Sequence, residues 1–532
     1  MQLIIPMSGR GDRFLRAGYR VPKPLIPIEG KPIVEHVLNL FPGVEDVVFV
    51  CNTEHLAATP LRAVLQRLRP AARVVAIEPH NLGPVHATLQ AAPWIPDDDE
   101  VIVNYCDFSA RWDFARFRRT VREVGCDGCI TAYRGFHPHS LGPTFYAYLR
   151  HQDHWMEEIQ EKACFTDNRM EEYASAGTYY FARGRHVTRY FAELVRRQQS
   201  LNGEYYVSLV YNLMRADGLR TWVYELDQFL QWGTPEDLEE YLGWSEFFHG
   251  PGARGVPAAP TPGTPQAAGT NLVPMAGAGR RFQEAGYTVP KPFVPVDGAP
   301  MVVQAVRAYP AAARWVFVAQ QSHLAVGGFA DTVRRQYPSC TIVSVDGLTA
   351  GQASTCQLAE PHVPPEAPLF IGACDHSMVW DPARFVALAG GARYDALIWT
   401  FQGHAGVRRH PQMYSYVEVA PDGVTALRVS TKVPLSDRPD RDHAVVGAFW
   451  FRRAKAFFDA VRHLMAMTPE RPGGEWYVDT CLNAAIALGM TVGVFQIDRY
   501  IGWGTPDELK TYEYWSRYFR RAPDAVHRAA VL

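Results

Sequence analysis

Residues 3–27 read LIIPMSGRGDRFLRAGYRVPKPLIP, and this stretch decides how the whole chain is organised. A short apolar run, typical of a buried strand, ends in a glycine-rich turn, and a lysine between two prolines follows. Residues 271–295 repeat the pattern as NLVPMAGAGRRFQEAGYTVPKPFVP, which places Lys291 268 positions after Lys23. A repeat of this period is as long as a domain, so the sequence predicts a tandem duplication and not a solenoid.

Further landmarks recur in the same order in both halves, with small changes of offset. The matched pairs are Gly83 and Gly351, Asp107 and Asp375, Trp112 and Trp380, Gly177 and Gly447, Glu204 and Glu475, and Gly233 and Gly504. The stretch between the repeats is rich in proline, glycine and alanine and has no apolar periodicity, as linkers often do. We therefore predict domain 1 over residues 1–248, a linker over 249–270 and domain 2 over 271–532.

Apolar strands alternate with helices in the first part of each repeat. The first repeat predicts strands at 2–6, 47–50, 74–77, 101–103, 130–133, 178–181 and 221–224, and helices at 32–40, 55–68, 84–92, 187–198, 205–216 and 235–247. This alternation favours an α/β fold class with two tandem Rossmann-like domains, each a mostly parallel mixed sheet flanked by helices. Ligands of such sheets bind beyond the carboxyl ends of the strands, where the glycine-rich loop and Asp107 fall.

Bulk composition excludes several classes of protein. The net charge of −2 is far from the basic excess of a general nucleic-acid-binding surface. Because the amino terminus has no basic leader and no apolar stretch is long enough for a bilayer, we expect neither a signal peptide nor membrane insertion. The nine cysteines are scattered and odd in number, which favours reduced thiols in a cytoplasmic protein. The oligomeric state stays open.

The residues around the glycine-rich loop suit phosphate chemistry. Gly9 and Gly11 allow backbone N–H groups to converge on an anion, and Arg13 offers a fork of donors that matches phosphate geometry. Lys23 is a compact point charge on a stiff segment, and Asp107, at a strand end, can hold Mg2+ between phosphates. The second repeat offers Gly277, Gly279, Arg281, Lys291 and Asp375.

This ordered set, present twice, resembles the sugar-phosphate nucleotidyltransferase family, whose members include enzymes of capsule and surface-polysaccharide synthesis. The resemblance implies two nucleotidyltransferase domains, each converting an NTP and a sugar phosphate to an NDP-sugar and pyrophosphate with Mg2+ as cofactor. It implies catalytic roles for Arg13, Lys23, Arg281 and Lys291, nucleotide-binding roles for Gly9, Gly11, Gly83, Gly277, Gly279 and Gly351, and acceptor-binding roles for Lys162, Gly177, Lys432 and Gly447. Asp107 and Asp375 would bind the metal.

The chain departs from the family pattern at two places. Many members carry a second metal-binding Asp just before the Gly-Thr near the domain end, whereas this chain has Gln231-Trp232 and Gly502-Trp503 there. Asp227 and Asp498, a few residues earlier, are candidates for that second carboxylate. Glu204 and Glu475 are candidates too, although a solvated or capping role is favoured for those two. Lys432 also lacks the preceding acid that Lys162 has in Glu161.

Two alternative functions stay open. The enzyme could be a cytidylyltransferase that acts on a non-sugar phosphate or a phosphonate head group. In the other alternative, one domain is catalytic and the other is a nucleotide-sensing or regulatory module. The sequence names neither the NTP nor the acceptor, because those choices depend on pocket shape in the irregular later part of each repeat.

Overall fold

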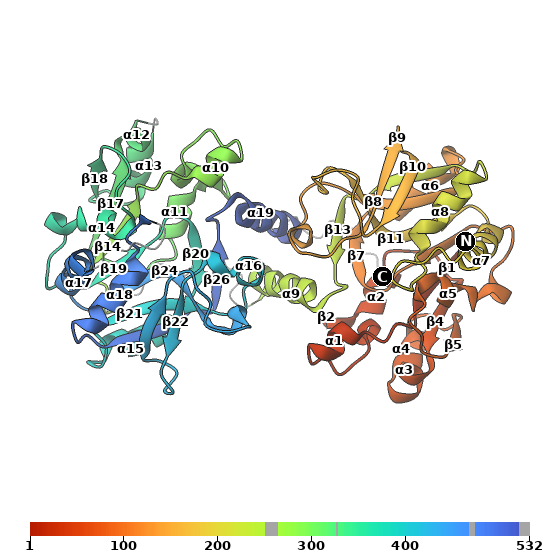
Figure 1. The fold of residues 1–532 in the computed structure, drawn as a ribbon, viewed down its shortest axis with the longest axis horizontal. Helices are drawn as coiled ribbons and strands as arrows, with labels where there is room; N and C mark the ends of the chain where they lie inside the picture. Colours follow the sequence, from red (N-terminus) through yellow and green to blue (C-terminus); the bar gives the residue numbers. More distant parts are fainter. Residues whose placement is uncertain (251–263, 326–327, 468–473, 521–532) are drawn as a thin grey trace. The chain divides into compact units, whose positions relative to one another are not determined.

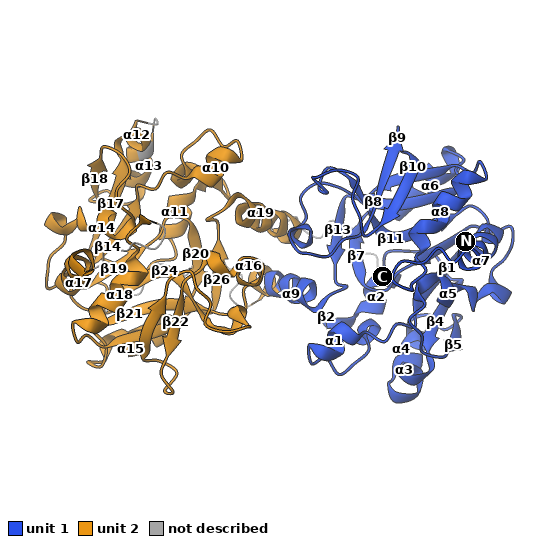
Figure 2. Cartoon of the chain, in the orientation of Figure 1, with its two compact units in different colours: residues 1–245 blue, residues 246–532 orange. Residues whose placement is uncertain are grey.

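The computed structural model describes residues 1–250, 264–325, 328–467 and 474–520. The chain divides into two compact units, unit 1 over residues 1–245 and unit 2 over residues 246–532 (Figure 2). Of the predicted linker, residues 251–263 lie outside the described residues. Strand β14 (Thr270–Met275) begins at residue 270, the last position of the predicted linker.

Unit 1 is built on a mixed nine-stranded sheet with the order β5-β4-β1-β6-β11-β8-β12-β10-β9 (Figure 1). The strands are β1 (Gln2–Met7), β4 (Val47–Asn52), β5 (Arg73–Ile77), β6 (Val101–Asn104), β8 (Gly128–Tyr133), β9 (Ala147–Gln152), β10 (Trp155–Glu161), β11 (Tyr173–Phe181) and β12 (Thr221–Glu225). The first four strands in the order pair in parallel, and β11 runs antiparallel to both β6 and β8. The predicted α/β class is therefore confirmed.

Helices cover this sheet. Those of unit 1 are α1 (Asp12–Arg16), α2 (Ile33–Leu38), α3 (Thr53–Ala58), α4 (Leu61–Leu68), α5 (Gly83–Leu89), α6 (Phe114–Glu123), α7 (Gly184–Arg196) and α8 (Val207–Ala216), and α9 (Pro235–His249) follows them. The single helix predicted at 55–68 is two helices, because Pro60 drives the residue before it out of the helical region. Helix α6 and the hairpin of β9 and β10 were not predicted.

The central strands are buried on both faces. All six residues of β1 and all six of β4 are buried, as expected of parallel strands between two helical layers. Ile4, Val48, Val103 and Phe181 belong to the core on one face of the sheet. This continuous burial explains why the apolar runs identified these strands in the sequence.

Unit 2 repeats the strand order of unit 1. Its order β18-β17-β14-β19-β24-β21-β25 matches β5-β4-β1-β6-β11-β8-β12 strand for strand. The further strands of its main sheet are β17 (Arg314–Gln320), β18 (Thr341–Val345), β19 (Leu369–Gly372), β21 (Ala396–Phe401), β22 (Tyr416–Val419), β23 (Ala426–Ser430), β24 (His443–Phe451) and β25 (Val492–Gln496). Its helices are α10 (Arg280–Glu284), α11 (Met301–Val306), α12 (Gln321–Leu324), α13 (Phe329–Gln336), α14 (Gln352–Gln357), α15 (Pro382–Gly390), α16 (Ala405–Arg409), α17 (Ala454–Met467), α18 (Val478–Ala487) and α19 (Pro506–Arg520).

A short antiparallel ribbon beside each main sheet carries the turn that holds the predicted metal-binding Asp. In unit 1 it pairs β7 (Phe108–Arg111) with β13 (Gln228–Gln231), and in unit 2 it pairs β20 (His376–Val379) with β26 (Arg499–Gly502). The remaining two-stranded pieces are β2 (Pro27–Ile28) with β3 (Lys31–Pro32) and β15 (Pro295–Val296) with β16 (Ala299–Pro300). Every helix in the described ranges is too short or too polar to cross a lipid bilayer.

Candidate functional site

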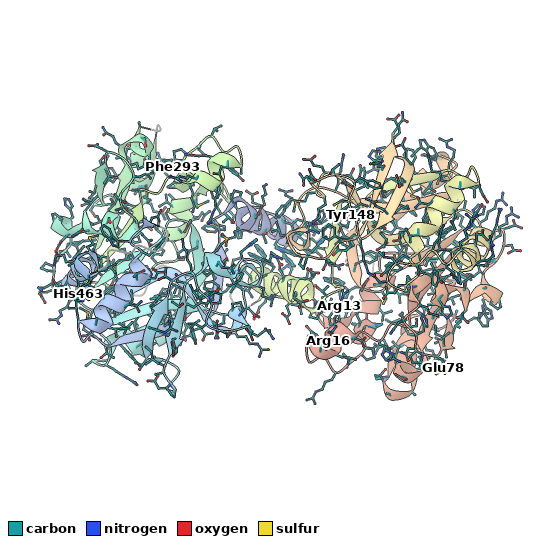
Figure 3. The ribbon with its side chains drawn as sticks, viewed as in Figure 1. Arg13, Arg16, Glu78, Tyr148, Phe293 and His463 are labelled. Carbon is teal, nitrogen blue, oxygen red and sulfur yellow. The ribbon has the colours of Figure 1, made fainter. Side chains whose placement is uncertain are left out.

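The glycine-rich loop leads from the first strand of each unit into a short helix. Gly11 has φ 72° and Gly279 has φ 64°, both in the left-handed region that favours glycine. The loop therefore turns sharply, and Arg13 lies in the first turn of α1 (Figure 3). Arg281 has the same place in α10. Together with the surrounding residues, the loops line clefts of about 480 Å³ in unit 1 and about 430 Å³ in unit 2.

In the cleft of each unit, the lysine between two prolines contacts the carboxylate of the Asp that follows a central strand. Lys23 Nζ donates to Asp107 Oδ2 at 3.0 Å and to the backbone oxygen of Gly233 at 3.2 Å. In unit 2, Lys291 Nζ donates to Asp375 Oδ2 at 2.5 Å. Three segments far apart in the sequence, the Pro-Lys-Pro turn, the strand end and the Gly-Thr turn, thus meet in the cleft of unit 1.

Electrostatics in the unit 2 cleft favour the charged forms of this pair. Burial alone would raise the pKa of Asp375, but the Lys291 ammonium and the neighbouring His376 hold that pKa well below its usual value. Burial alone would lower the pKa of Lys291, and the Asp375 carboxylate raises it above the usual value instead. The unit 2 cleft therefore holds a paired ammonium and carboxylate.

Gly83 and Gly351 allow a close backbone approach on the opposite wall. Gly83 has φ +84°, and a Cβ placed there would lie 2.8 Å from the backbone nitrogen and oxygen of Tyr205. Gly351 has φ +121°, and the same contact with Trp476 would be 2.5 Å. A side chain at either glycine would displace the loop that contains Tyr205 or Trp476. The preceding residues of these loops, Glu204 and Glu475, line the clefts, so the two glycines help to position them.

Lys162 directly follows β10 with φ 56°, and it joins a hydrogen-bonded group in unit 1. Its Nζ donates to Tyr206 Oη at 2.6 Å, and Tyr206 itself lines the cleft. Ser208 Oγ donates to Glu161 Oε2 at 2.6 Å. Burial raises the pKa of Glu161. Sequence reasoning missed Tyr206, although a Tyr follows at the same place in both repeats.

The corresponding group in unit 2 uses different residues. Lys432 has φ 59° and its Nζ donates to Tyr477 Oη at 2.7 Å. Thr431 stands where unit 1 has Glu161, and the acid beside this lysine is Asp479 on α18, which is 8% exposed. Burial raises the pKa of Asp479. Lys432 is close enough to lower the pKa of Asp479 against that burial, but the hydrogen bonds of Asp479 are with Ser415 and Thr480.

Gly177 and Gly447 support the turn that carries the strand-end Asp. A Cβ on Gly177 would lie 3.1 Å from both Tyr105 and Phe108, and one on Gly447 would lie 3.7 Å from both Ala373 and His376. Tyr105 N donates to the Gly177 backbone oxygen at 3.0 Å, and Ala373 N donates to that of Gly447 at 3.2 Å. These glycines therefore lie directly against the turn that precedes each ribbon.

Asp227 and Asp498 are not brought together with the strand-end carboxylates. Asp107 directly precedes the end of its ribbon where Phe108 pairs with Gln231. Asp227 directly precedes Gln228, at the opposite end. The two ends of the ribbon are three residues apart, which is about 10 Å along a strand. Asp498 adjoins the end of its ribbon remote from Asp375 and forms an exposed ion pair with Arg384 at 2.9 Å. The ribbons, whose pairing the sequence did not reveal, separate these residues.

The carboxylates present suit a metal that shares its ligands with a substrate. No group of three or more His, Cys, Asp or Glu side chains that could hold an ion occurs among the described residues. Mg2+ commonly binds through one or two carboxylates, phosphate oxygens and water. Asp107, with a side chain 30% exposed in the cleft, fits that donor set.

Comparison with known proteins finds similarity over parts of this chain. Residues 3–167 match the MobA-like NTP transferase domain. The bifunctional protein GlmU of Rhodopseudomonas palustris is 28% identical over 231 residues, which cover 42% of this chain and 48% of that protein. GlmU of Aromatoleum aromaticum is 36% identical over 107 residues, 20% of this chain and 22% of that protein. The chain thus spans about half the length, or less, of these curated relatives.

Two solved structures are also similar to parts of the chain. The nucleoside-diphosphate-sugar pyrophosphorylase of Vibrio cholerae is 24% identical with a TM-score of 0.38, covering 46% of this chain and 98% of that chain. The inositol-1-phosphate CTP transferase of T. maritima is 19% identical with a TM-score of 0.36, covering 48% of this chain and 98% of that chain.

Proposed function

We propose, from the premise that residues 3–167 match an NTP transferase domain, that unit 1 is a nucleotidyltransferase. It converts an NTP and a sugar phosphate to an NDP-sugar and pyrophosphate, as a cytoplasmic step of capsule or surface-polysaccharide synthesis. One observation carries the proposal: the contact of Lys23 with Asp107 in a cleft that the glycine-rich loop lines. The contact places a fixed cation and a carboxylate in the same cleft.

The chemistry requires little more than positioned charges. An oxygen of the acceptor phosphate attacks the α-phosphorus of the NTP, the bond to the bridging oxygen breaks, and pyrophosphate leaves. Negative charge gathers around the phosphorus, and preorganised donors stabilise it. Lys23 and Arg13 supply cationic donors from the loop side, and Lys162 binds the acceptor phosphate from the other side. Mg2+, held by Asp107 and the phosphates, would neutralise triphosphate charge.

We extend the proposal to unit 2, which we infer to be a second nucleotidyltransferase domain from a tandem duplication. Its cleft pairs Lys291 with Asp375 and is lined by Gly277, Gly279 and Arg281. The pair that unit 1 is proposed to use for turnover is thus also present in unit 2. Both units are therefore proposed to turn over.

Pyrophosphate release tests the proposal on the full-length chain. The enzyme is incubated with each of the four NTPs, with Mg2+, and with a panel of sugar phosphates and non-sugar phosphates or phosphonates. We expect acceptor-dependent release with at least one sugar phosphate. Release only with CTP and non-sugar acceptors would establish the cytidylyltransferase alternative. Nucleotide binding without release under any condition would contradict the proposal.

The variants Lys23→Ala and Lys291→Ala assign the activity to a unit. If both units are catalytic, each single variant retains the activity of the other unit, and the double variant has almost none. If Lys291→Ala leaves all turnover unchanged while nucleotide still binds to unit 2, that unit is a sensing module. Lys31→Ala is the matched control, because Lys31 forms an exposed ion pair with Glu35 at 3.4 Å.

A further inference from the structure

The turn between the two short strands β2 and β3 carries an acid that the last helix of unit 1 binds. Glu29 and Gly30 form this turn, with φ 50° and 82°. Tyr241 Oη donates to Glu29 Oε1 at 2.9 Å, and Ser245 Oγ donates to the same oxygen at 2.6 Å. Both donors belong to α9 and are four residues apart, so they lie on one side of the helix.

Unit 2 repeats this contact between its own turn and its own last helix. Asp297 and Gly298, with φ 48° and 77°, join β15 and β16. Tyr512 Oη donates to Asp297, and Ser516 Oγ donates to Asp297 Oδ1 at 3.3 Å. Arg520 also forms an ion pair with Asp297 at 2.8 Å. The tyrosine and the serine have the same spacing in α19 as in α9, so the contact has the same design in both units.

A hairpin turn does not by itself call for the acid of unit 1. Two-residue turns with positive φ at both positions favour Asn-Gly or Asp-Gly, and glutamate is uncommon at positive φ. Glu29 is also exposed, so burial does not account for its identity. Tyr241 and Ser245 are 3% and 7% exposed. The contact therefore fixes an exposed turn to a buried face of α9.

The segment that precedes the turn is stiff, and it carries the cleft lysine at its other end. Pro24 and Pro27 fix two backbone φ angles between Lys23 and Glu29. The backbone nitrogen of Ile26 donates to the oxygen of Lys23 at 3.1 Å, which closes a helical turn at the lysine. A displacement of the hairpin turn would therefore be passed along the segment to the lysine.

The same helix also meets the lysine end of this segment. Lys23 Nζ donates to the backbone oxygen of Gly233 at 3.2 Å, and α9 begins two residues later, at Pro235. Tyr241 lies six residues beyond Pro235, which is about 9 Å along a helix axis. One helix thus holds both ends of the segment 23–29.

We propose that Glu29 and Asp297 are positioning residues, which set the places of Lys23 and Lys291 in the clefts by binding the last helix of each unit. The inference rests on the proposed function. Among the described residues that line the clefts, neither acid occurs, so each acts through its lysine. Placement of that lysine matters, because a shift of about 1 Å in a reacting group can cost about a hundredfold in rate.

The test uses the full-length chain with unit 2 silenced by Lys291→Ala. Tyr241→Phe combined with Ser245→Ala, the donor variant, removes both hydroxyls and keeps the tyrosine ring. Glu29→Gly removes the acid and suits the positive φ, and Glu29→Asp introduces the residue of unit 2. We measure kcat, the Kd of the NTP and the thermal midpoint. The donor variant is also made on the Lys23→Ala background, where the residual turnover is measured.

A second measurement does not depend on turnover. Competitive acylation with acetic anhydride, read by mass spectrometry, compares the reactivity of Lys23 with that of Lys31, whose side chain is 46% exposed. Tyr190→Phe is the matched control for the tyrosine change, because Tyr190 on α7 donates in the same way to Asp217, at 3.0 Å.

We expect the donor variant to lower kcat about tenfold or more, with much smaller changes in the Kd of the NTP and in the thermal midpoint. Glu29→Gly should lower kcat in the same way, whereas Glu29→Asp and Tyr190→Phe should retain it. On the Lys23→Ala background the donor variant should have almost no further effect, because changes that act through the same residue are not additive. Acylation of Lys23 relative to Lys31 should increase.

Two results would overturn the inference while leaving the proposed function intact. One is an equal loss of kcat on both backgrounds, which would show that the contact acts on the fold and not through Lys23. The other is an unchanged kcat with unchanged Lys23 acylation. Glu29→Gly alters no buried residue, so it still reports if the donor variant fails to fold. No pyrophosphate release from the unmodified chain would instead remove the proposed function, and the acylation ratio would still test the contact.

Discussion

Lys23→Ala is the sharpest test of the cleft in unit 1. The substitution removes an ammonium that lies 3.0 Å from Asp107 Oδ2 and 3.2 Å from the Gly233 oxygen. We expect this ammonium to stabilise the phosphate oxygens more strongly in the transition state than in the ground state. Removal of one preorganised donor typically costs about a hundredfold to a thousandfold in kcat, equivalent to about 3–4 kcal/mol. The affinity for NTP should fall less than kcat does.

Stability should change little, because the pair is partly solvated. The side chains of Lys23 and Asp107 are 20% and 30% exposed, so their ion pair contributes at most about 1 kcal/mol to the free energy of unfolding. For a unit of this size, a loss of about 1 kcal/mol lowers the thermal midpoint by about 2–4 °C. The catalytic effect should therefore clearly exceed the structural one.

The assay measures kcat, KM and the Kd of the NTP in an Lys291→Ala background, where only unit 1 turns over, and the thermal midpoint of each protein. Lys31→Ala should match the parent in every respect. A large fall of the midpoint with normal kcat would show that the Pro-Lys-Pro turn is a structural element. Normal kcat with a normal midpoint would remove Lys23 from the mechanism.

Four further results are expected. Asp107→Asn should abolish the Mg2+-dependent turnover of unit 1, and an unchanged rate and metal dependence across a Mg2+ titration would argue against a metal role for Asp107. Gly83→Ala should lower the thermal midpoint by more than Gly30→Ala does. Both glycines have positive φ, at +84° and +82°, but only a Cβ on Gly83 would meet backbone atoms, at 2.8 Å. Equal midpoints of the two variants would refute the close contact. Burial raises the pKa of Asp479 in the folded state above its value in the unfolded state. At a pH between these two pKa values folding takes up a proton, so the free energy of unfolding falls as the pH rises through that range. In urea titrations at several pH values, Asp479→Asn should lack this pH dependence. Proteolytic cleavage within 251–263 should leave two separately folded pieces, because each unit has its own sheet and core; aggregation of both pieces would argue against this.

The apolar runs and the glycine loop could be assigned from the sequence because their causes are local. A strand buried on both faces must be apolar at every position, as in β1, and a left-handed turn such as Gly11 requires glycine. The effect of Pro60 is equally local, since it ends the first part of the helix predicted at 55–68. The ribbon strands have only four residues each, and the β9–β10 hairpin is partly exposed, so the alternation of apolar and polar residues in these segments is weak.

The sequence by itself determined the α/β class and the internal repeat, because apolar burial and backbone sterics act along one stretch of chain. It pointed to Lys23, Asp107, Lys291 and Asp375 one by one, but not to the pairs that they form. Only the tertiary structure decided that Lys432 bonds to Tyr477, and that Asp227 and Asp498 lie away from the strand-end carboxylates. Those facts depend on where a helix or ribbon places residues 45 or 123 positions away, as with Lys432 and Tyr477 or Phe108 and Gln231. Side-chain hydrogen bonds form between whichever groups the packed elements bring within about 3 Å, and spacing along the chain does not record that distance.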